Sequence, residues 1–79
     1  MYLDLFNGNG VLTSGRKVWV DTESDYREVA ERIRKSDEWS DDDVATLAYH
    51  AGILDEYADA ESIEEIAEKA ADILGVEIL

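Results

Sequence analysis

The sequence predicts a small α+β domain in which three helices pack on one face of an antiparallel sheet, in the order ββαααβ. Three observations lead to this prediction. Strand-like runs occur near both ends of the chain, Asn-Gly pairs follow the first run, and three stretches repeat apolar residues with helical spacing. With 79 residues, the chain has room for one domain with a small core, and we expect residues 1–79 to form it.

The N-terminal residues are expected to form a β-hairpin. Residues 2–6 alternate apolar and polar side chains, and residues 17–20 form a second strand-like run. Between them, residues 7–10 contain two Asn-Gly pairs, which favour the positive φ angles of tight turns. Residues 76–79 are short and strand-like, and we expect them to complete the sheet.

The first two helices are predicted from caps and apolar spacing. Thr22 or Ser24 caps a helix whose apolar positions recur at i, i+3, i+4 and i+7: Tyr26, Val29, Ala30 and Ile33. Ser40 caps the second helix, and Gly52 suits a left-handed end. Three acids fill its first turn, where the helix dipole favours them: Asp41, Asp42 and Asp43.

The third helix is expected between Ser62 and Gly75, after an acidic connection over residues 53–60. Ser62 and Glu65 have the spacing of a capping box, and Gly75 ends the apolar periodicity. The core is expected to contain alternate residues of the strands and apolar residues of the helices: Leu3, Leu5, Val18, Val20, Val29, Ile33, Leu47, Ile66 and Leu74.

The charge of the chain is strongly acidic and unevenly distributed. Asp and Glu number 20 against 7 Lys and Arg, which gives a formal net charge of −13. Residues 1–36 are balanced, whereas residues 37–79 contain Lys69 as their one base. Direct binding to nucleic acid or to an anionic membrane needs a positive surface, so both classes are excluded. The asymmetry favours an acidic surface that faces a partner, and the alternative is a solvation coat suited to high salt.

Catalysis and metal binding have little support in the sequence. There is no cysteine, and His50, the single histidine, is expected to be a surface or half-buried helix residue. No serine lies in a nucleophile-elbow motif, and the acids do not fit a calcium-binding loop. We therefore expect no enzyme, no catalytic residue, no metal and no cofactor. Without a membrane-length apolar run or a signal pattern after Met1, we expect a soluble cytoplasmic monomer.

Acidic residues on the third helix form the candidate partner-binding face. At 100° per residue its apolar positions gather on one side, and its acids gather on the opposite side. Successive carboxylates climb about 5–6 Å, comparable with the steps between phosphates along a nucleic-acid strand. Such a row fits a basic groove that evolved for DNA. With the acids that precede this helix, the candidate residues are Asp41, Asp42, Asp43, Asp55, Glu56, Asp59, Glu61, Glu64, Glu65, Glu68 and Asp72.

Two patches of the sequence resemble the ArdA antirestriction family, acidic proteins of phages and mobile elements that imitate bent DNA. Residues 15–21, Gly-Arg-Lys-Val-Trp-Val-Asp, are similar to the family's Gly-x-Trp-[Ile/Val]-Asp strand. Glu56-Tyr57 and residues 62–67, Ser-Ile-Glu-Glu-Ile-Ala, are similar to its Glu-Tyr and Ser-Leu-Glu-Glu-[Ile/Val]-Ala run. The likeness spans about half of a full family member, and residues 48–52 replace its acidic Asp-Tyr-Glu segment.

The resemblance implies inhibition of a prokaryotic defence system by DNA mimicry. The size of the chain also resembles the small acidic anti-CRISPR proteins of phages. We therefore expect an inhibitor that occupies the basic DNA-binding groove of a CRISPR surveillance complex. Two alternatives stay open: an ArdA-like inhibitor of a restriction enzyme, and an acidic antitoxin or adaptor that neutralises a basic partner protein.

Overall fold

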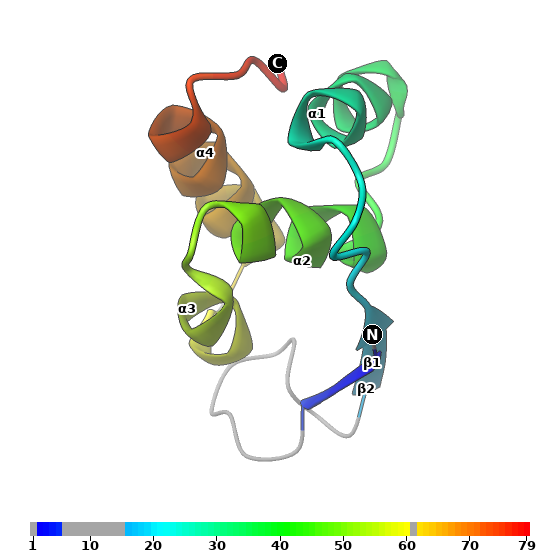
Figure 1. Ribbon diagram of the computed structural model, residues 1–79, viewed down its shortest axis with the longest axis vertical. Coiled ribbons are helices and arrows are strands. Elements are labelled where there is room, and N and C mark those ends of the chain that lie inside the picture. The colour runs from blue at the N-terminus through cyan, green and yellow to red at the C-terminus, as the bar shows by residue number, and fades with distance from the viewer. Residues whose placement is uncertain (1, 6–15, 61) are drawn as a thin grey trace.

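The computed structural model describes residues 2–5, 16–60 and 62–79, in which the chain is mostly helical (Figure 1). The expected turn at residues 7–10 and the side chains of Leu3 and Leu5 lie outside this description. The elements in chain order are β1 (Tyr2–Leu5), β2 (Arg16–Trp19), α1 (Tyr26–Lys35), α2 (Asp41–His50), α3 (Leu54–Asp59) and α4 (Ile63–Leu74).

Helix α2 is the centre of the molecule. It packs against α1, α3, α4 and β2, and Figure 1 shows it crossing the middle of the fold. Because neighbours surround it, five consecutive residues are buried: Val44, Ala45, Thr46, Leu47 and Ala48. Helices α1 and α4 each bury one apolar stripe against the core and expose the opposite side.

The predicted α+β layer pair is wrong, because the described chain is mostly helical and its four helices do not cover a sheet. The strands β1 and β2 pair antiparallel over four residues each, with Tyr2 opposite Trp19, at one end of the molecule. The predicted third strand at residues 76–79 is not formed. That segment instead lies across the core, where Ile78 is buried.

Most of the predicted core residues are buried. The structure confirms six of them as buried: Val18, Val20, Val29, Ile33, Leu47 and Ile66. Leu74, at the end of α4, is only half-buried and packs against the edge of the core. Trp19 lies on the opposite face of β2 from Val18 and is 44% exposed, as strand alternation requires. The predicted core did not include Tyr57, an α3 side chain that is fully buried.

The helix ends follow the predicted caps in part. Ser40 accepts a hydrogen bond from the Asp43 N–H at 3.1 Å, as predicted for α2. Helix α1 is capped by Asp25 instead of Thr22 or Ser24. The predicted capping box of α4 is wrong, since no side chain caps that helix and the Ser62 hydroxyl contacts Glu64 instead of Glu65. Gly52 adopts positive φ, as predicted, and Gly75 ends α4, as predicted, also with positive φ.

The connection predicted over residues 53–60 contains the helix α3. Ile53, the residue before its first turn, provides no side-chain cap, so the sequence carries no start signal there. Tyr57 anchors α3 because its ring is fully buried in the core and its hydroxyl donates to the Asp41 carbonyl oxygen at 3.4 Å. Across the described residues, no helix has the length and apolar character needed to span a membrane.

Candidate partner-binding surface

Helix α4 carries a row of exposed carboxylates. Ile66, Ala67 and Ala70 are buried, which turns the acids of the helix towards solvent. Glu64, Glu65, Glu68 and Asp72 are all exposed. The spacing of four residues aligns Glu64, Glu68 and Asp72 along the helix, over a rise of about 12 Å.

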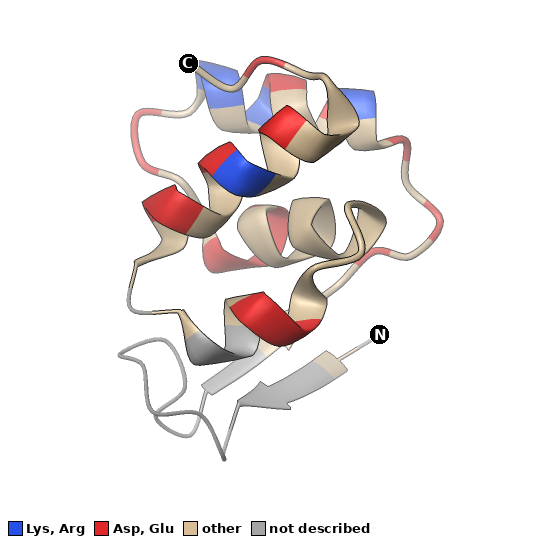
Figure 2. Ribbon diagram, turned by 90° about the vertical axis from the view of Figure 1, so that its left-hand side faces the viewer, with Lys and Arg blue, Asp and Glu red and all other residues tan. Residues whose placement is uncertain are grey.

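Helix α3 adds acids on the same side of the molecule. Figure 2 shows acidic segments of α3 and α4 facing the viewer together. Asp55 is exposed and Glu56 is half-buried. We call the described acids of the two helices the acidic face: Asp55, Glu56, Glu64, Glu65, Glu68 and Asp72.

A groove between α3 and α4 runs through the acidic face. Its lining consists of Glu56, Glu65, Ile66, Glu68, Lys69 and Asp72. Lys69 forms an ion pair with Glu56, thirteen residues earlier in the chain, and so ties α4 to α3. The one base of residues 37–79 therefore lies within the acidic face and is held by one of its carboxylates.

Glu64 is the acid whose ionisation the structure favours most clearly on this surface. The Ser62 hydroxyl donates to Glu64 Oε2 at 2.7 Å. This hydrogen bond, with help from the backbone N–H of Glu64, lowers the pKa of the carboxyl below its usual value. Glu64 consequently keeps its negative charge further into the acid range than an ordinary glutamate.

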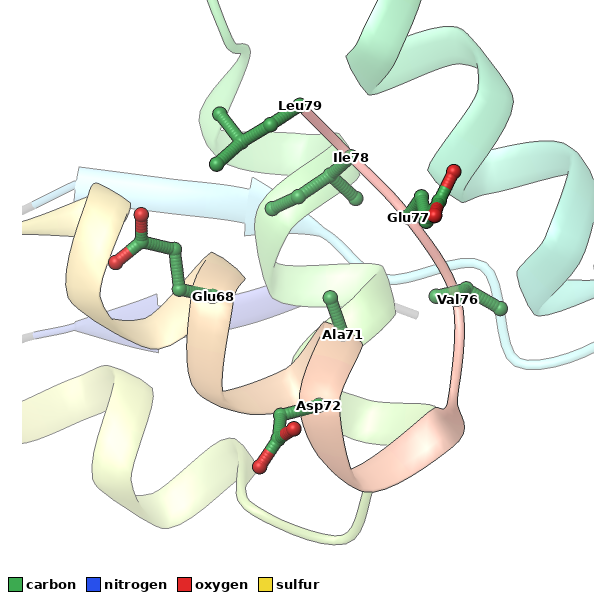
Figure 3. A pocket seen from close by; sticks show the side chains of 7 residues that line it. All are labelled: Glu68, Ala71, Asp72, Val76, Glu77, Ile78 and Leu79. Atoms are coloured by element: carbon green, nitrogen blue, oxygen red, sulfur yellow. The ribbon is translucent and has the colours of Figure 1, made fainter.

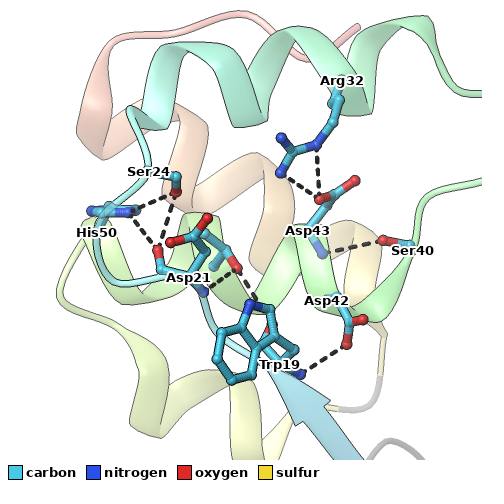
Figure 4. A network of polar contacts seen from close by, with 9 residues as sticks. Trp19, Asp21, Ser24, Arg32, Ser40, Asp42, Asp43 and His50 are labelled. Atoms are coloured by element: carbon cyan, nitrogen blue, oxygen red, sulfur yellow. Dashed lines mark hydrogen bonds and ion pairs between the residues drawn. The ribbon is translucent and has the colours of Figure 1, made fainter. Parts of the chain in front are cut away.

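The acidic triplet at the start of α2 makes contacts within the fold (Figure 4). Asp42 Oδ1 accepts a hydrogen bond from the Trp19 N–H at 2.9 Å, which joins α2 to β2. Asp43 Oδ1 accepts from Nε and Nη2 of Arg32, at 3.1 and 2.9 Å, which joins α2 to α1 and raises the pKa of Arg32. Asp41 is half-buried beside Tyr57. Two of these predicted partner-binding carboxylates are thus already engaged inside the molecule.

Four of the six bases of residues 1–36 lie on α1, away from α3 (Figure 2): Arg27, Arg32, Arg34 and Lys35. Local acids pair with several of them. Arg27 lies 3.3 Å from Asp25, and its backbone and side-chain hydrogen bonds lower the pKa of that carboxyl. Lys35 lies 3.0 Å from Glu31 and lowers the pKa of this carboxyl through a hydrogen bond. The charge asymmetry of the sequence therefore separates α1, which carries four bases, from the acidic face of α3 and α4.

His50 is half-buried, as expected, at the end of α2. Its Nε2 lies 3.2 Å from the Asp21 carbonyl oxygen and 3.4 Å from Ser24 Oγ, while Ser24 donates to the same carbonyl at 3.1 Å. The partner of the imidazole is a main-chain carbonyl, so these residues do not form a Ser-His-Asp triad. They attach the turn before α1 to the end of α2, a role that the sequence did not reveal.

Two candidate residues cannot be placed on this surface. The Asp59 side chain and the whole of Glu61 lie outside the description of the structure. Among the described residues, no three His, Cys, Asp or Glu side chains are grouped to hold a metal ion.

Comparison of the chain with protein-family models, with curated proteins and with solved structures finds no match.

Proposed function

We propose that this protein is a non-enzymatic inhibitor of a prokaryotic defence complex, most directly a CRISPR surveillance complex, and that it competes with target DNA for a basic channel. The observation that carries the proposal is the acidic face of α3 and α4, where four exposed α4 carboxylates are accompanied by a single base that Glu56 already neutralises. The ArdA-like patches of the sequence agree with this function.

The physical basis is electrostatic complementarity. A groove lined by Lys and Arg attracts a polyanion over a distance set by the ionic strength, whether the polyanion is DNA or a protein surface. The carboxylates of α4 are fixed on a helix whose opposite stripe is buried, so they keep their spacing when a partner approaches. Binding then requires little ordering of the inhibitor, which preserves affinity.

A solvation coat would have a different distribution of charge. A coat that only holds water would not need the two signs of charge to be separated, whereas here α1 carries four bases and the acidic face of α3 and α4 contains Lys69 as its one base. The proposed interface also predicts a strong salt dependence, because exposed charges are screened within about 8 Å at physiological ionic strength.

The test begins with the immobilised protein and a panel of purified CRISPR surveillance complexes and restriction enzymes. The proposal predicts retention of at least one CRISPR complex and its release by excess target duplex, with weaker retention as salt rises. Retention of a restriction enzyme alone would move the function to antirestriction. A complex that holds the protein and DNA together, or retention unchanged by salt, would contradict competition for the DNA channel.

A further inference from the structure

A depression with an apolar floor adjoins the acidic face. It lies between α4 and residues 76–79, and Figure 3 shows the side chains that line it. Ala71 comes from the helix, while Val76, Ile78 and Leu79 come from the segment that crosses back over the core. Leu79 is 83% exposed, which leaves apolar surface open to solvent at this point.

Carboxylates border this apolar floor. Glu68 and Asp72 line the depression from α4, and both also line the groove between α3 and α4. They therefore form a ridge between the apolar hollow and the groove that separates α3 from α4. Glu77 lies on the far border, where it also faces a hollow lined by Arg27 and Arg34. Among the described residues that line the depression itself, none is basic.

We infer that the depression takes an apolar side chain from a basic polypeptide segment, whose flanking Lys or Arg residues pair with Glu68 and Asp72. The inference rests on the proposed function in one respect, that the partner is a basic protein. Beyond that function, it specifies the position at which the partner inserts an apolar side chain and the acids that flank this side chain. A partner that touched only carboxylates would leave this apolar surface in water.

Charge decides between the possible occupants. A nucleic acid would bring phosphates against Glu68 and Asp72, and a second copy of this chain would bring another net charge of −13. A basic segment instead gains attraction at the ridge and burial in the hollow. Interfaces commonly combine these features, with an apolar centre enclosed by a charged rim.

The experiment uses two fluorescein-labelled pentapeptides at low salt, lysine-arginine-leucine-arginine-lysine and its equivalent with serine at the centre. The leucine peptide should bind the protein roughly fivefold more tightly, as expected when about half of a leucine side chain leaves water. Its addition should shift the methyl NMR signals of Ala71 and Ile78, and the serine peptide should not. Equal affinities with unchanged methyl signals would overturn the inference.

Three variants locate the contact. Leu79→Ser removes exposed apolar surface from the depression and should abolish the preference for leucine. Ile73→Ser is the matched control, since Ile73 is 52% exposed and does not line the depression. It should leave the preference intact. Glu68→Gln with Asp72→Asn should weaken both peptides equally, because it removes charge and leaves the floor unchanged.

The outcomes separate this inference from the proposed function. A leucine preference that survives Leu79→Ser or disappears in Ile73→Ser would overturn the assigned position. Equal binding of the two peptides would overturn the inference without affecting competition with DNA. A leucine preference located at Leu79, in a protein that releases no DNA from any defence complex, would overturn the proposed function alone.

Discussion

Arg32 on α1 and Asp43 on α2 form an ion pair with two contacts, in which Nε and Nη2 lie 3.1 and 2.9 Å from Oδ1. The two residues are eleven positions apart, and their contact fixes the first helix against the central one. Asp43 belongs to the most acidic run of the chain, yet its charge is used inside the fold. The acids of this chain therefore fall into two groups. Some, such as Asp43, make contacts that hold the fold together, and others, on α3 and α4, are exposed on the acidic face.

Replacing Asp43 should affect stability. Asp43→Ala is expected to lower the free energy of unfolding by about 0.5–1 kcal/mol, because the pair is only partly shielded and solvent weakens it. Urea denaturation at low salt measures the change. Glu31→Ala, which removes an exposed pair with Lys35, should have a smaller effect. An unchanged unfolding midpoint in Asp43→Ala would show that the contact with Arg32 contributes nothing to the fold.

The serines that precede α2 and α4 should contribute differently to stability. Ser40→Ala should lower the free energy of unfolding by about 1 kcal/mol, because the Ser40 side chain accepts the Asp43 N–H at the start of α2. Ser62→Ala is the matched control at the start of α4, where no side-chain hydrogen bond caps the helix. Thermal denaturation of both variants compares them directly. Equal losses would contradict the difference between the two helix starts.

Ser62→Ala should instead change the titration of Glu64. Removing the hydroxyl that donates to Oε2 should raise the Glu64 pKa towards its ordinary value. Because the folded-state pKa is depressed, this carboxylate stabilises the native protein above its unfolded pKa of about 4.3. That contribution is lost as the pH falls through the folded pKa. Side-chain NMR titration of the wild type and the variant measures the shift, and identical titration curves would contradict the assignment.

Thr46 is the buried polar residue of α2, and its hydroxyl should matter more than its size. Its Oγ1 accepts the Asp21 N–H at 3.1 Å and lies 3.5 Å from the Trp19 carbonyl oxygen. Thr46→Val keeps the shape but leaves a part-buried N–H without this acceptor, so it should cost about 1–3 kcal/mol. Thr46→Ser retains the hydroxyl and should lose less. A valine variant as stable as the wild type would refute this role.

The sequence predicted local elements better than their assembly. Periodic apolar stripes located the helices that became α1, α2 and α4, since each stripe had to face a core. The predicted core contained Leu47 as its one residue from α2, whereas five consecutive residues of this helix are buried because four elements surround it. Which elements meet is a tertiary property that periodicity does not encode.

The missed elements have specific physical causes. Helix α3 lacks a capping side chain and is stabilised by burial of Tyr57, a contact with distant residues. Residues 76–79 have strand propensity, but Ile78 is buried in the core without strand pairing. For the surface, helical geometry predicted the exposure of the α4 acids correctly. It could not show that Asp42 and Asp43 bond to β2 and α1.

The most direct test of the proposed function compares two triple charge reversals. Glu64, Glu65 and Glu68 are changed to Lys on α4, and Glu23, Glu28 and Glu31 are changed to Lys before and on α1. All six side chains are exposed, and both variants carry the same net charge. Circular dichroism first establishes that both variants keep the helical content of the wild type.

The measurement is displacement of fluorescently labelled target DNA from the CRISPR complex that the immobilised protein retains. The α4 variant should require on the order of 100-fold more protein for half-displacement, because three lysines would face the basic channel. The α1 variant should displace DNA nearly as well as the wild type. Equal loss in both variants, or full displacement by the α4 variant, would contradict the claim that the acidic face of α3 and α4 takes the place of DNA.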